Sequence, residues 1–131
     1  MILFDPETGA PTCVAHAGEV TAIRTAAASA VATDALARPK ATRLAILGYG
    51  EQAETHLRAV RHVRPLDHVT VWGRSLERAW AFAARMAQET GLPVVAASDV
   101  ESAVAQADII CTVSGSQEPI LKGAWVRPEP T

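Results

Sequence analysis

The sequence predicts an α/β protein with a Rossmann-type doubly wound parallel sheet, preceded by a β-hairpin and an alanine-rich helix. Three observations lead to this fold class. An apolar run at 44–47 enters the pattern Gly-x-Gly-x-x-Ala at 48–53 and then an amphipathic segment, which is typical of a strand, a tight turn and a helix. From residue 44 onward, strand-like and helix-like segments alternate as βαβαβαβ, which favours parallel strands with right-handed crossovers. The 131 residues are enough for one hydrophobic core.

Composition narrows the class of protein. The chain is 49% hydrophobic and 20% charged with a formal charge of −2, so it has no basic surface for a nucleic acid, and no apolar run is long enough to span a bilayer. Cys13 and Cys111 are too few for a disulfide framework, which favours a cytoplasmic location. We expect no metal site, because His56, His62 and His68 have no metal-ligand spacing and are expected at the surface or at helix ends.

The first segments predict a hairpin and a helix. Residues 1–4 and 12–16 are short runs of strand character on either side of the turn cluster 5–9. A hairpin of this size is not stable alone, so we expect it to join a sheet and expect the chain to lack an N-terminal portion. Residues 19–38 predict an alanine-rich helix that ends at Pro39.

Arg24 and Thr25 lie near the start of that helix and are candidate substrate-binding residues. A guanidinium there faces the unfavourable end of the helix dipole, and a bound anion would relieve this. A solvated Arg24, or one paired with Glu19, is the structural alternative.

The turn at 48–53 is the predicted pyrophosphate site. Gly48 permits the tight turn out of the strand, Gly50 lets the backbone approach a ligand closely, and Ala53 lets the new helix pack on the strand. The free N–H groups and the dipole of that helix, predicted at 50–63, then attract an anion. A turn with no ligand is the alternative. The predicted cofactor-binding residues of this segment are Gly48, Tyr49, Gly50, Glu51, Gln52 and Ala53.

The end of the next strand, predicted at 69–72, indicates the cofactor type. An NAD site usually has an acidic residue here, but this chain has Gly73, Arg74 and Ser75. A guanidinium and a hydroxyl can bind a 2′-phosphate, so NADP(H) is favoured over NAD(H). Ser75 can also simply cap the helix expected at 76–90, and capping and phosphate binding can coexist.

The remaining segments complete the predicted sheet. Gly91 ends the helix at 76–90, a strand follows at 94–96, and Asp99 or Ser98 caps a short helix at 100–106. The last predicted strand, 107–113, brings the segment 112–116, including Gly115 and Ser116, to the carboxyl edge, where ligands of open α/β sheets bind. The predicted cofactor-binding residues of this segment are Thr112, Val113 and Ser114.

Three further expectations concern the surface and the C-terminal part. Residues 119–121 predict another short strand or extended segment, and residues 127–131 predict an irregular tail. Arg58, Arg61 and Arg64 are expected on a solvated helix face.

Several motifs together resemble the ornithine cyclodeaminase/mu-crystallin family. They are the segments 5–11 and 21–28, the turn Gly48-Tyr49-Gly50-Glu51-Gln52-Ala53, and the segments 71–75, 107–113 and 118–121. The resemblance implies a homodimer with one NAD(P)-binding domain and one domain that binds the substrate and forms the dimer. Residues 1–40 would then be a remnant of the second domain, and residues 41–131 a Rossmann domain truncated at its C-terminus.

The resemblance also implies a reaction. Members exchange a hydride between nicotinamide and the amine or imine carbon of an amino acid or a cyclic imine, and the residue that Arg24 matches binds the substrate carboxylate. The catalytic Lys and Asp of the family match no residue here, so we assign no catalytic residue and expect cofactor binding with little or no turnover. A non-catalytic mu-crystallin-like binding protein, or an inactive fragment, is the alternative.

Overall fold

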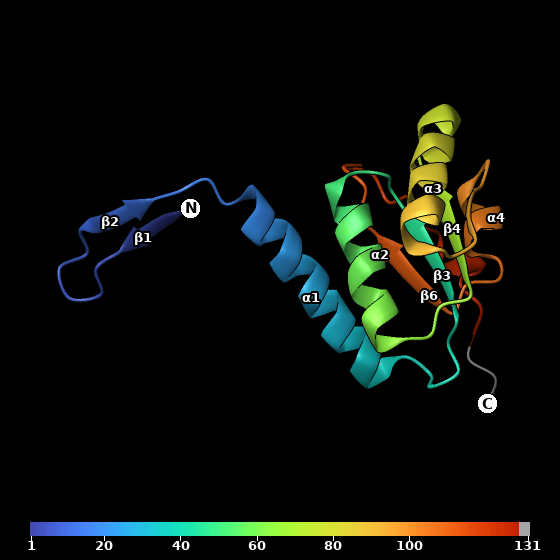
Figure 1. Cartoon of the computed structure of the whole chain (residues 1–131), viewed down its shortest axis with the longest axis horizontal. Coiled ribbons are helices and arrows are strands. Elements are labelled where there is room, and N and C mark those ends of the chain that lie inside the picture. The colour runs from blue at the N-terminus through green and yellow to red at the C-terminus, as the bar shows by residue number, and fades with distance from the viewer. Residues whose placement is uncertain (129–131) are drawn as a thin grey trace.

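The computed structural model describes residues 1–128, so the expectation of an irregular tail lies, for residues 129–131, outside the described part. Strands and helices alternate in the predicted order (Figure 1). The elements are β1 (Ile2–Phe4), β2 (Pro11–Val14), α1 (Gly18–Leu36), β3 (Arg43–Leu47), α2 (Glu51–Val63), β4 (His68–Trp72), α3 (Leu76–Thr90), β5 (Val94–Ala96), α4 (Val100–Val104), β6 (Ile109–Thr112) and a 3₁₀ turn, Gly123–Trp125.

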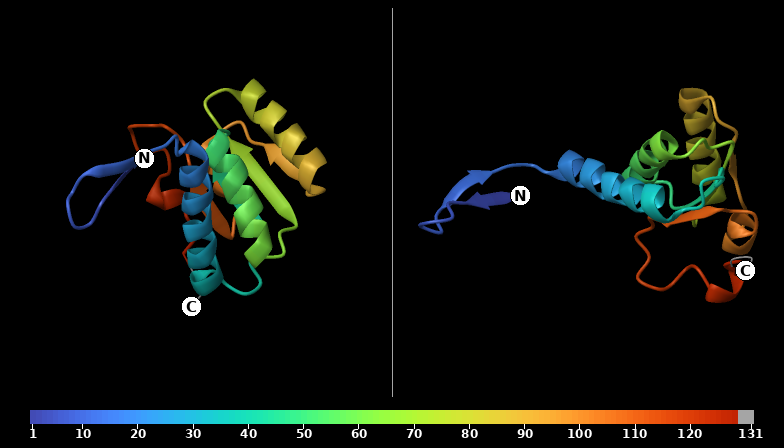
Figure 2. Two further views of the ribbon diagram at one scale, coloured as in Figure 1. Left: turned by 60° about the vertical axis from the view of Figure 1, so that its left-hand side comes forward. Right: turned by 90° about the horizontal axis from the view of Figure 1, so that it is seen from below.

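The central sheet has the strand order β5-β4-β3-β6, and every pair in it is parallel. Helices α2 and α3 cover one face and α4 lies on the other (Figure 2), which confirms the doubly wound α/β fold. Strand β3 is central, because β4 and β6 pair with its two edges. The organising strand of the sequence therefore lies in the middle of the sheet.

The core has two layers because β3 is apolar on both faces. Leu44 and Ile46 face α2 and α3, while Ala45 and Leu47 face α4. All four side chains are at most 1% exposed. This two-sided burial explains why the strand reads as a continuous apolar run rather than an alternating one.

The helix ends follow the signals in the sequence. The Ser75 hydroxyl accepts a hydrogen bond from the backbone N–H of Arg78 at 3.3 Å, and Asp99 accepts one from the N–H of Ser102 at 2.7 Å. Gly91 ends α3 with φ of 71°, a conformation that glycine adopts readily. Capping by Ser75 and by Asp99 is thus confirmed.

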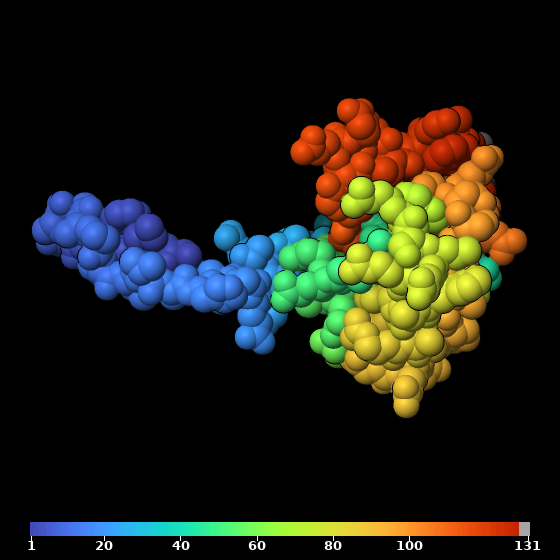
Figure 3. Space-filling view, turned by 90° about the horizontal axis from the view of Figure 1, so that it is seen from above, coloured from blue at the N-terminus to red at the C-terminus, as the bar shows by residue number. Residues whose placement is uncertain are grey.

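The hairpin of β1 and β2 stands away from the rest of the molecule (Figure 3). Its two strands form an antiparallel sheet of their own, and all their residues are exposed. The turn is fixed locally, since the Asp5 carboxylate accepts from the N–H groups of Glu7 and Thr8 at 2.9 and 2.7 Å. Cys13 on β2 is exposed as well. Within the described residues, the hairpin joins no larger sheet.

Helix α1 packs on α2 through small side chains. Ala22, Ala26 and Ala30 recur every four residues and are the buried positions of α1. This spacing places them on one face of the helix, where their size permits a close approach.

Arg64 contacts the C-terminal end of α1. The prediction that the Arg64 side chain is solvated is therefore wrong. Its side chain is 9% exposed. One terminal nitrogen, Nη2, donates to the carbonyls of Thr33, Asp34 and Ala37 at 3.1, 2.9 and 2.9 Å. The other, Nη1, contacts the Asp34 carboxylate at 2.9 Å. Arg64 therefore caps the C-terminus of α1, where carbonyls lack helical partners.

His56 also lies inside the protein, contrary to the expectation of a surface position. It is 3% exposed between α1 and α2. Its Nδ1 is 2.6 Å from the Gln52 carbonyl oxygen and its Nε2 is 3.0 Å from the Ser29 hydroxyl. A carbonyl only accepts, so Nδ1 carries the proton and the ring links the two helices.

The segment after β6 forms no strand, so of the two expectations for 119–121 the short strand is wrong. The Ser116 hydroxyl donates to the Glu118 carbonyl at 2.8 Å, and this local contact holds a bend. Pro119 then lacks a backbone N–H for a ladder.

Cys111 in β6 is partly buried, and burial raises the pKa of its thiol to about 11. Among residues 1–128, no helix is long and apolar enough to cross a membrane.

Candidate functional site

A cavity of about 260 Å³ opens at the carboxyl ends of β3, β4 and β6. It lies where the sequence places a ligand, because parallel strands on either side of β3 end at the same edge. Seven of the predicted cofactor-binding residues line it: Gly48, Tyr49, Gly50, Gly73, Arg74, Val113 and Ser114.

Gly48 is required by the turn out of β3. Its φ is 140°, and a Cβ at this position would lie 2.7 Å from the carbonyl oxygen of Val113. Its N–H donates to the carbonyl of Trp72 at 2.7 Å, so the turn is held between the ends of β4 and β6. This agrees with the tight turn that the sequence predicts.

Gly50 leaves open space at the start of α2. A Cβ on Gly50 would meet no atom within 4 Å, and no side chain caps the helix. The amide groups of the first turn are thus exposed to a ligand, and the helix dipole favours a negative one. The residues present therefore fit a bound phosphate group.

Tyr49 forms a wall of the cavity together with Gly73. A Cβ on Gly73 would lie 2.0 Å from the Tyr49 ring, so the ring occupies the space that a larger residue at 73 would need. The guanidinium of Arg78 lies over the ring, 5.3 Å from its centre. The ring therefore leans toward the end of β4 and the start of α3, away from the amide groups at the start of α2.

The other predicted cofactor residues lie outside this cavity. Ala53 is fully buried in the core, Glu51 is exposed, and Ser75 caps α3. The Gln52 side-chain oxygen is buried without a hydrogen-bond partner among the described residues. Thr112 lines a neighbouring cavity, which it shares with Ser114, Ser116 and Ile120.

Arg24 and Thr25 are exposed on α1 and do not line the cavity. Within residues 1–128, Arg24 forms no salt bridge, either with Glu19 or with another residue. The alternative of a Glu19 partner is therefore wrong.

Three lining residues escaped the sequence analysis, namely Trp72, Arg78 and Ile120. Arg78 was detectable, because it lies in the first turn of α3, just after Arg74 and the capping Ser75. Gly115 and Ser116 line the cavity at the carboxyl edge, where the sequence places them.

The cavity lining favours binding over proton transfer. It has two guanidinium groups, Arg74 and Arg78, and two serine hydroxyls. No Asp, Glu, His, Lys or Cys belongs to it within the part of the chain that the structure describes. The site can hold an anionic ligand, and its lining supplies no general acid or base that titrates near neutral pH.

Comparison with known proteins gives consistent matches along the whole chain. The model of the Ornithine cyclodeaminase/mu-crystallin family matches residues 1–129. Ketimine reductase mu-crystallin of Mus musculus is 40% identical over 128 residues, 98% of this chain and 40% of that protein. L-lysine cyclodeaminase of Streptomyces rapamycinicus is 40% identical over 127 residues, 97% of this chain and 36% of that protein.

A solved structure matches the fold closely. The Thermococcus litoralis Delta(1)-pyrroline-2-carboxylate reductase, in complex with NADH and L-proline, superimposes with a TM-score of 0.86 at 36% identity. The match covers 96% of this chain and 39% of that one. The chain thus spans about two fifths of the length of these relatives.

Proposed function

The chain belongs to the ornithine cyclodeaminase/mu-crystallin family, and on that premise we propose that its cavity binds NADP(H) for hydride exchange with an α-amino or α-imino acid. The relatives are imine reductases and amino-acid cyclodeaminases, and the Thermococcus reductase binds NADH. The single observation that carries the proposal is the open space over Gly50 at the uncapped start of α2. Bound reduced nicotinamide would supply a hydride to an imine carbon next to a carboxylate.

The pyrophosphate would lie against the turn at 48–50 and the first turn of α2. Gly50 has no side chain in the way, and the N–H groups there point out of the helix. Glu54 is an acid in the first turn of α2, and its carboxylate is already paired with Arg58 and Arg85. Val113 and Ser114 then line the nicotinamide half, beside Thr112 in the adjoining cavity.

The 2′-phosphate would lie at the end of β4. Among the residues that the structure describes, the cavity presents Arg74 and Arg78 there and no carboxylate for a free ribose hydroxyl. The Ser75 oxygen accepts from the Arg78 backbone, which leaves its O–H free to donate to a phosphate. Two guanidinium groups and a hydroxyl favour NADP(H) over NAD(H).

The substrate side would come from α1. We assign the carboxylate of a small amino acid or cyclic imine to Arg24, with Thr25 beside it, because both are exposed on the arm at 1–40. That arm would belong to the substrate and dimer domain of a cytoplasmic homodimer, and residues 41–131 to the cofactor domain. Within residues 1–128, the cavity lining has no acid or base that titrates near neutral pH, so the chain would bind cofactor with little or no turnover.

A non-catalytic nucleotide-binding protein is the second candidate. The cavity lining favours it, because among the described residues it holds cations and hydroxyls but no Asp, Glu, His, Lys or Cys. The two candidates differ in turnover rather than in cofactor affinity. Following reduced-nicotinamide absorbance with pyrroline-2-carboxylate separates them, and substantial turnover by the 131-residue chain would contradict the absence of catalytic groups.

Calorimetric titration with NADPH and NADH tests the cofactor assignment. We expect NADPH to bind about tenfold or more tightly than NADH, since one charge-assisted contact is worth that factor. Arg74→Gln should remove most of this preference, and Arg61→Gln, a charge change on an exposed arginine of α2, should leave it intact. Equal affinities would refute the 2′-phosphate role, and no heat with either dinucleotide would refute the site.

A further inference from the structure

A second polar cavity lies on the opposite side of the sheet from α2 and α3. We define the α4-face groove by its polar lining residues, Arg43, His68, Thr70, Ser98, Ser102 and Gln106. Its volume is about 390 Å³, which falls in the range of small-molecule sites, about 300 to 1,000 Å³. It shares no lining residue with the cofactor cavity.

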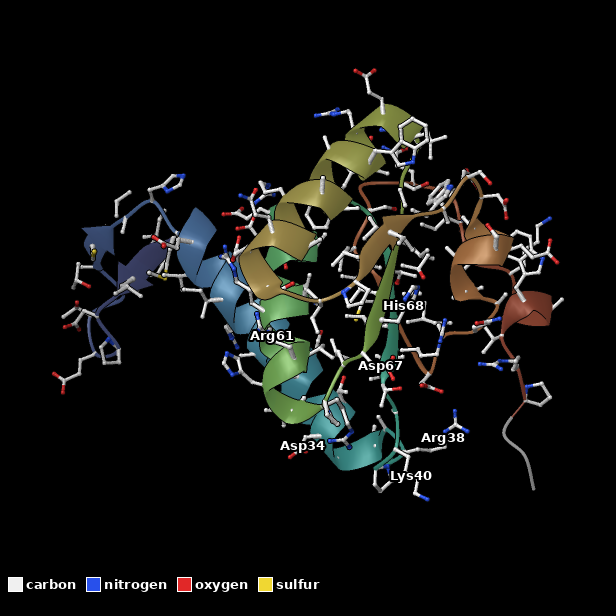
Figure 4. The ribbon with its side chains drawn as sticks, turned by 45° about the vertical axis from the view of Figure 1, so that its right-hand side comes forward. Asp34, Arg38, Lys40, Arg61, Asp67 and His68 are labelled. Carbon is white, nitrogen blue, oxygen red and sulfur yellow. The ribbon has the colours of Figure 1, made fainter. Side chains whose placement is uncertain are left out.

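The floor of the groove carries an unusual pair of side chains. Arg43 on β3 and His68 on β4 are register partners, so they lie side by side on one face of the sheet. Ala45 on the same face of β3 packs toward α4, which shows that this is the α4 face. Figure 4 shows His68 at the start of β4, close to β3. Two nitrogen-rich side chains therefore meet where an aliphatic pair would be usual.

These side chains have donors to spare. The guanidinium of Arg43 makes no salt bridge within residues 1–128. Its positive charge is therefore not neutralised by a carboxylate of the described residues, and an anion bound in the groove would pair with it. Thr70 and Gln106 add a hydroxyl and an amide at the same groove.

No carboxylate lines the groove in the described part of the chain. Asp99 accepts from the Ser102 N–H at 2.7 Å and from the Ser98 hydroxyl at 3.0 Å. Asp108 accepts from backbone N–H groups at the start of β3 and pairs with Arg38 at 3.0 Å, and Asp67, which precedes His68, is exposed. The Ser98 and Ser102 hydroxyls already donate to Asp99, so the donors left for a ligand are those of Arg43, His68, Thr70 and Gln106.

We propose that the α4-face groove binds the phosphate group of a small phosphate compound. Arg43 supplies its positive charge, and His68, Thr70 and Gln106 supply donors to the phosphate oxygens. The volume of about 390 Å³ is large enough for a small phosphomonoester. This site is separate from the anion site at the start of α2, so one molecule of the protein binds both ligands.

Site-resolved NMR titration of the full chain tests the proposal. Inorganic phosphate and glycerol 3-phosphate are titrated separately at constant ionic strength. We expect saturable shifts of the amides of Thr70, Ala97 and Ser98 and of the side-chain amide of Gln106. Shifts confined to the turn at 48–50 and to Arg74, or shifts that never saturate, would overturn the proposal.

Substitutions assign the effect to the groove. Arg43→Gln should weaken phosphate binding about tenfold or more, which is the worth of one lost charge-assisted contact. Gln106→Ala changes an exposed residue, so it keeps the fold and should weaken binding by a smaller factor. Arg61→Gln removes an exposed charge from α2, which covers the other face of the sheet (Figure 4), and should change nothing. Equal binding by all three variants would overturn the assignment.

Discussion

The N-terminal hairpin and the central sheet are both β-structure, yet they rest on different interactions. Every residue of β1 and β2 is exposed, whereas four of the five residues of β3 are buried. The hairpin is held by the pairing of its two strands and by the turn at Asp5, while the central sheet is packed between two apolar layers. Local turn chemistry is therefore enough to set the shape of a hairpin, but burial of apolar area supplies the stability of the sheet.

Helix α1 stands between these two regions. Its early residues lead to the hairpin, and its alanine face and C-terminus are fixed to the sheet domain by α2 and Arg64. Four experiments test this contrast between the exposed arm and the sheet domain with its buried core.

Truncating a core side chain and a hairpin side chain gives the largest contrast. Leu57 on α2 is 0% exposed, so Leu57→Ala should lower the free energy of unfolding by about 3 to 4 kcal/mol. Leu3 on β1 is 49% exposed, and Leu3→Ala should change it by less than about 0.5 kcal/mol. Urea unfolding measures both. Similar losses for the two variants would mean that the hairpin contributes to the core after all.

Removing Arg64 should loosen the arm from the domain. Arg64→Met leaves three carbonyls at the end of α1 without their donor, and we expect a loss of about 2 to 3 kcal/mol. Hydrogen exchange should accelerate in α1 more than in β3. Arg61→Met is the control, because Arg61 is exposed on α2. It should change neither the free energy of unfolding nor the exchange rates in α1. Unchanged exchange in α1 would refute the capping role.

The cavity wall gives a smaller effect. Gly73→Ala places a methyl group against the Tyr49 ring and should cost about 1 to 2 kcal/mol through crowding. In a Tyr49→Ala background the same substitution should cost almost nothing, because the ring is gone. A double-mutant cycle of unfolding free energies measures this coupling, and additive costs would argue against the contact.

Substitution of Asp108 should give the smallest change in the free energy of unfolding, and this change should depend on pH mainly below pH 3.8. Burial raises the pKa of Asp108, but the N–H groups of Thr42 and Arg43 and the charge of Arg38 outweigh burial and hold that pKa below its ordinary 3.8. Above pH 3.8 the carboxylate stabilises the fold fully. Below it the unfolded chain takes up a proton first, so stability falls toward the lowered folded pKa.

Asp108→Asn should therefore cost about 1 kcal/mol near neutral pH and flatten the fall of stability below pH 3.8. Urea unfolding between pH 2 and 6 measures both. The same acid dependence in the variant and the parent protein would show that another carboxylate is responsible.

The sequence predicts most of the fold because its signals are local. Apolar runs and caps placed α3 at its observed bounds, Leu76–Thr90, and the glycine pattern located the turn at 48–50. Helix α4 ends at Val104, earlier than predicted, since the chain must turn there: the Ala107 N–H returns to the Val104 carbonyl.

The errors concern residues whose partners are distant in sequence. Arg64 and His56 were assigned to the surface because α2 considered alone places them among polar residues. Their partners, Ala37 and Ser29, lie 27 residues away on the helix that covers them. Ile120 was missed as a cavity residue for a related reason, since a loop without a periodic pattern brings it to the edge.

The contrast between the two cysteines makes the arm accessible to spectroscopy. Burial keeps the Cys111 thiol protonated at neutral pH, while Cys13 lies exposed on the hairpin. Only thiolates react with maleimides, so a dye added near neutral pH should attach to Cys13 alone. The parent chain then carries one fluorophore on β2 of the hairpin, and energy transfer from the native tryptophans to this dye can report how the arm moves when a nucleotide binds.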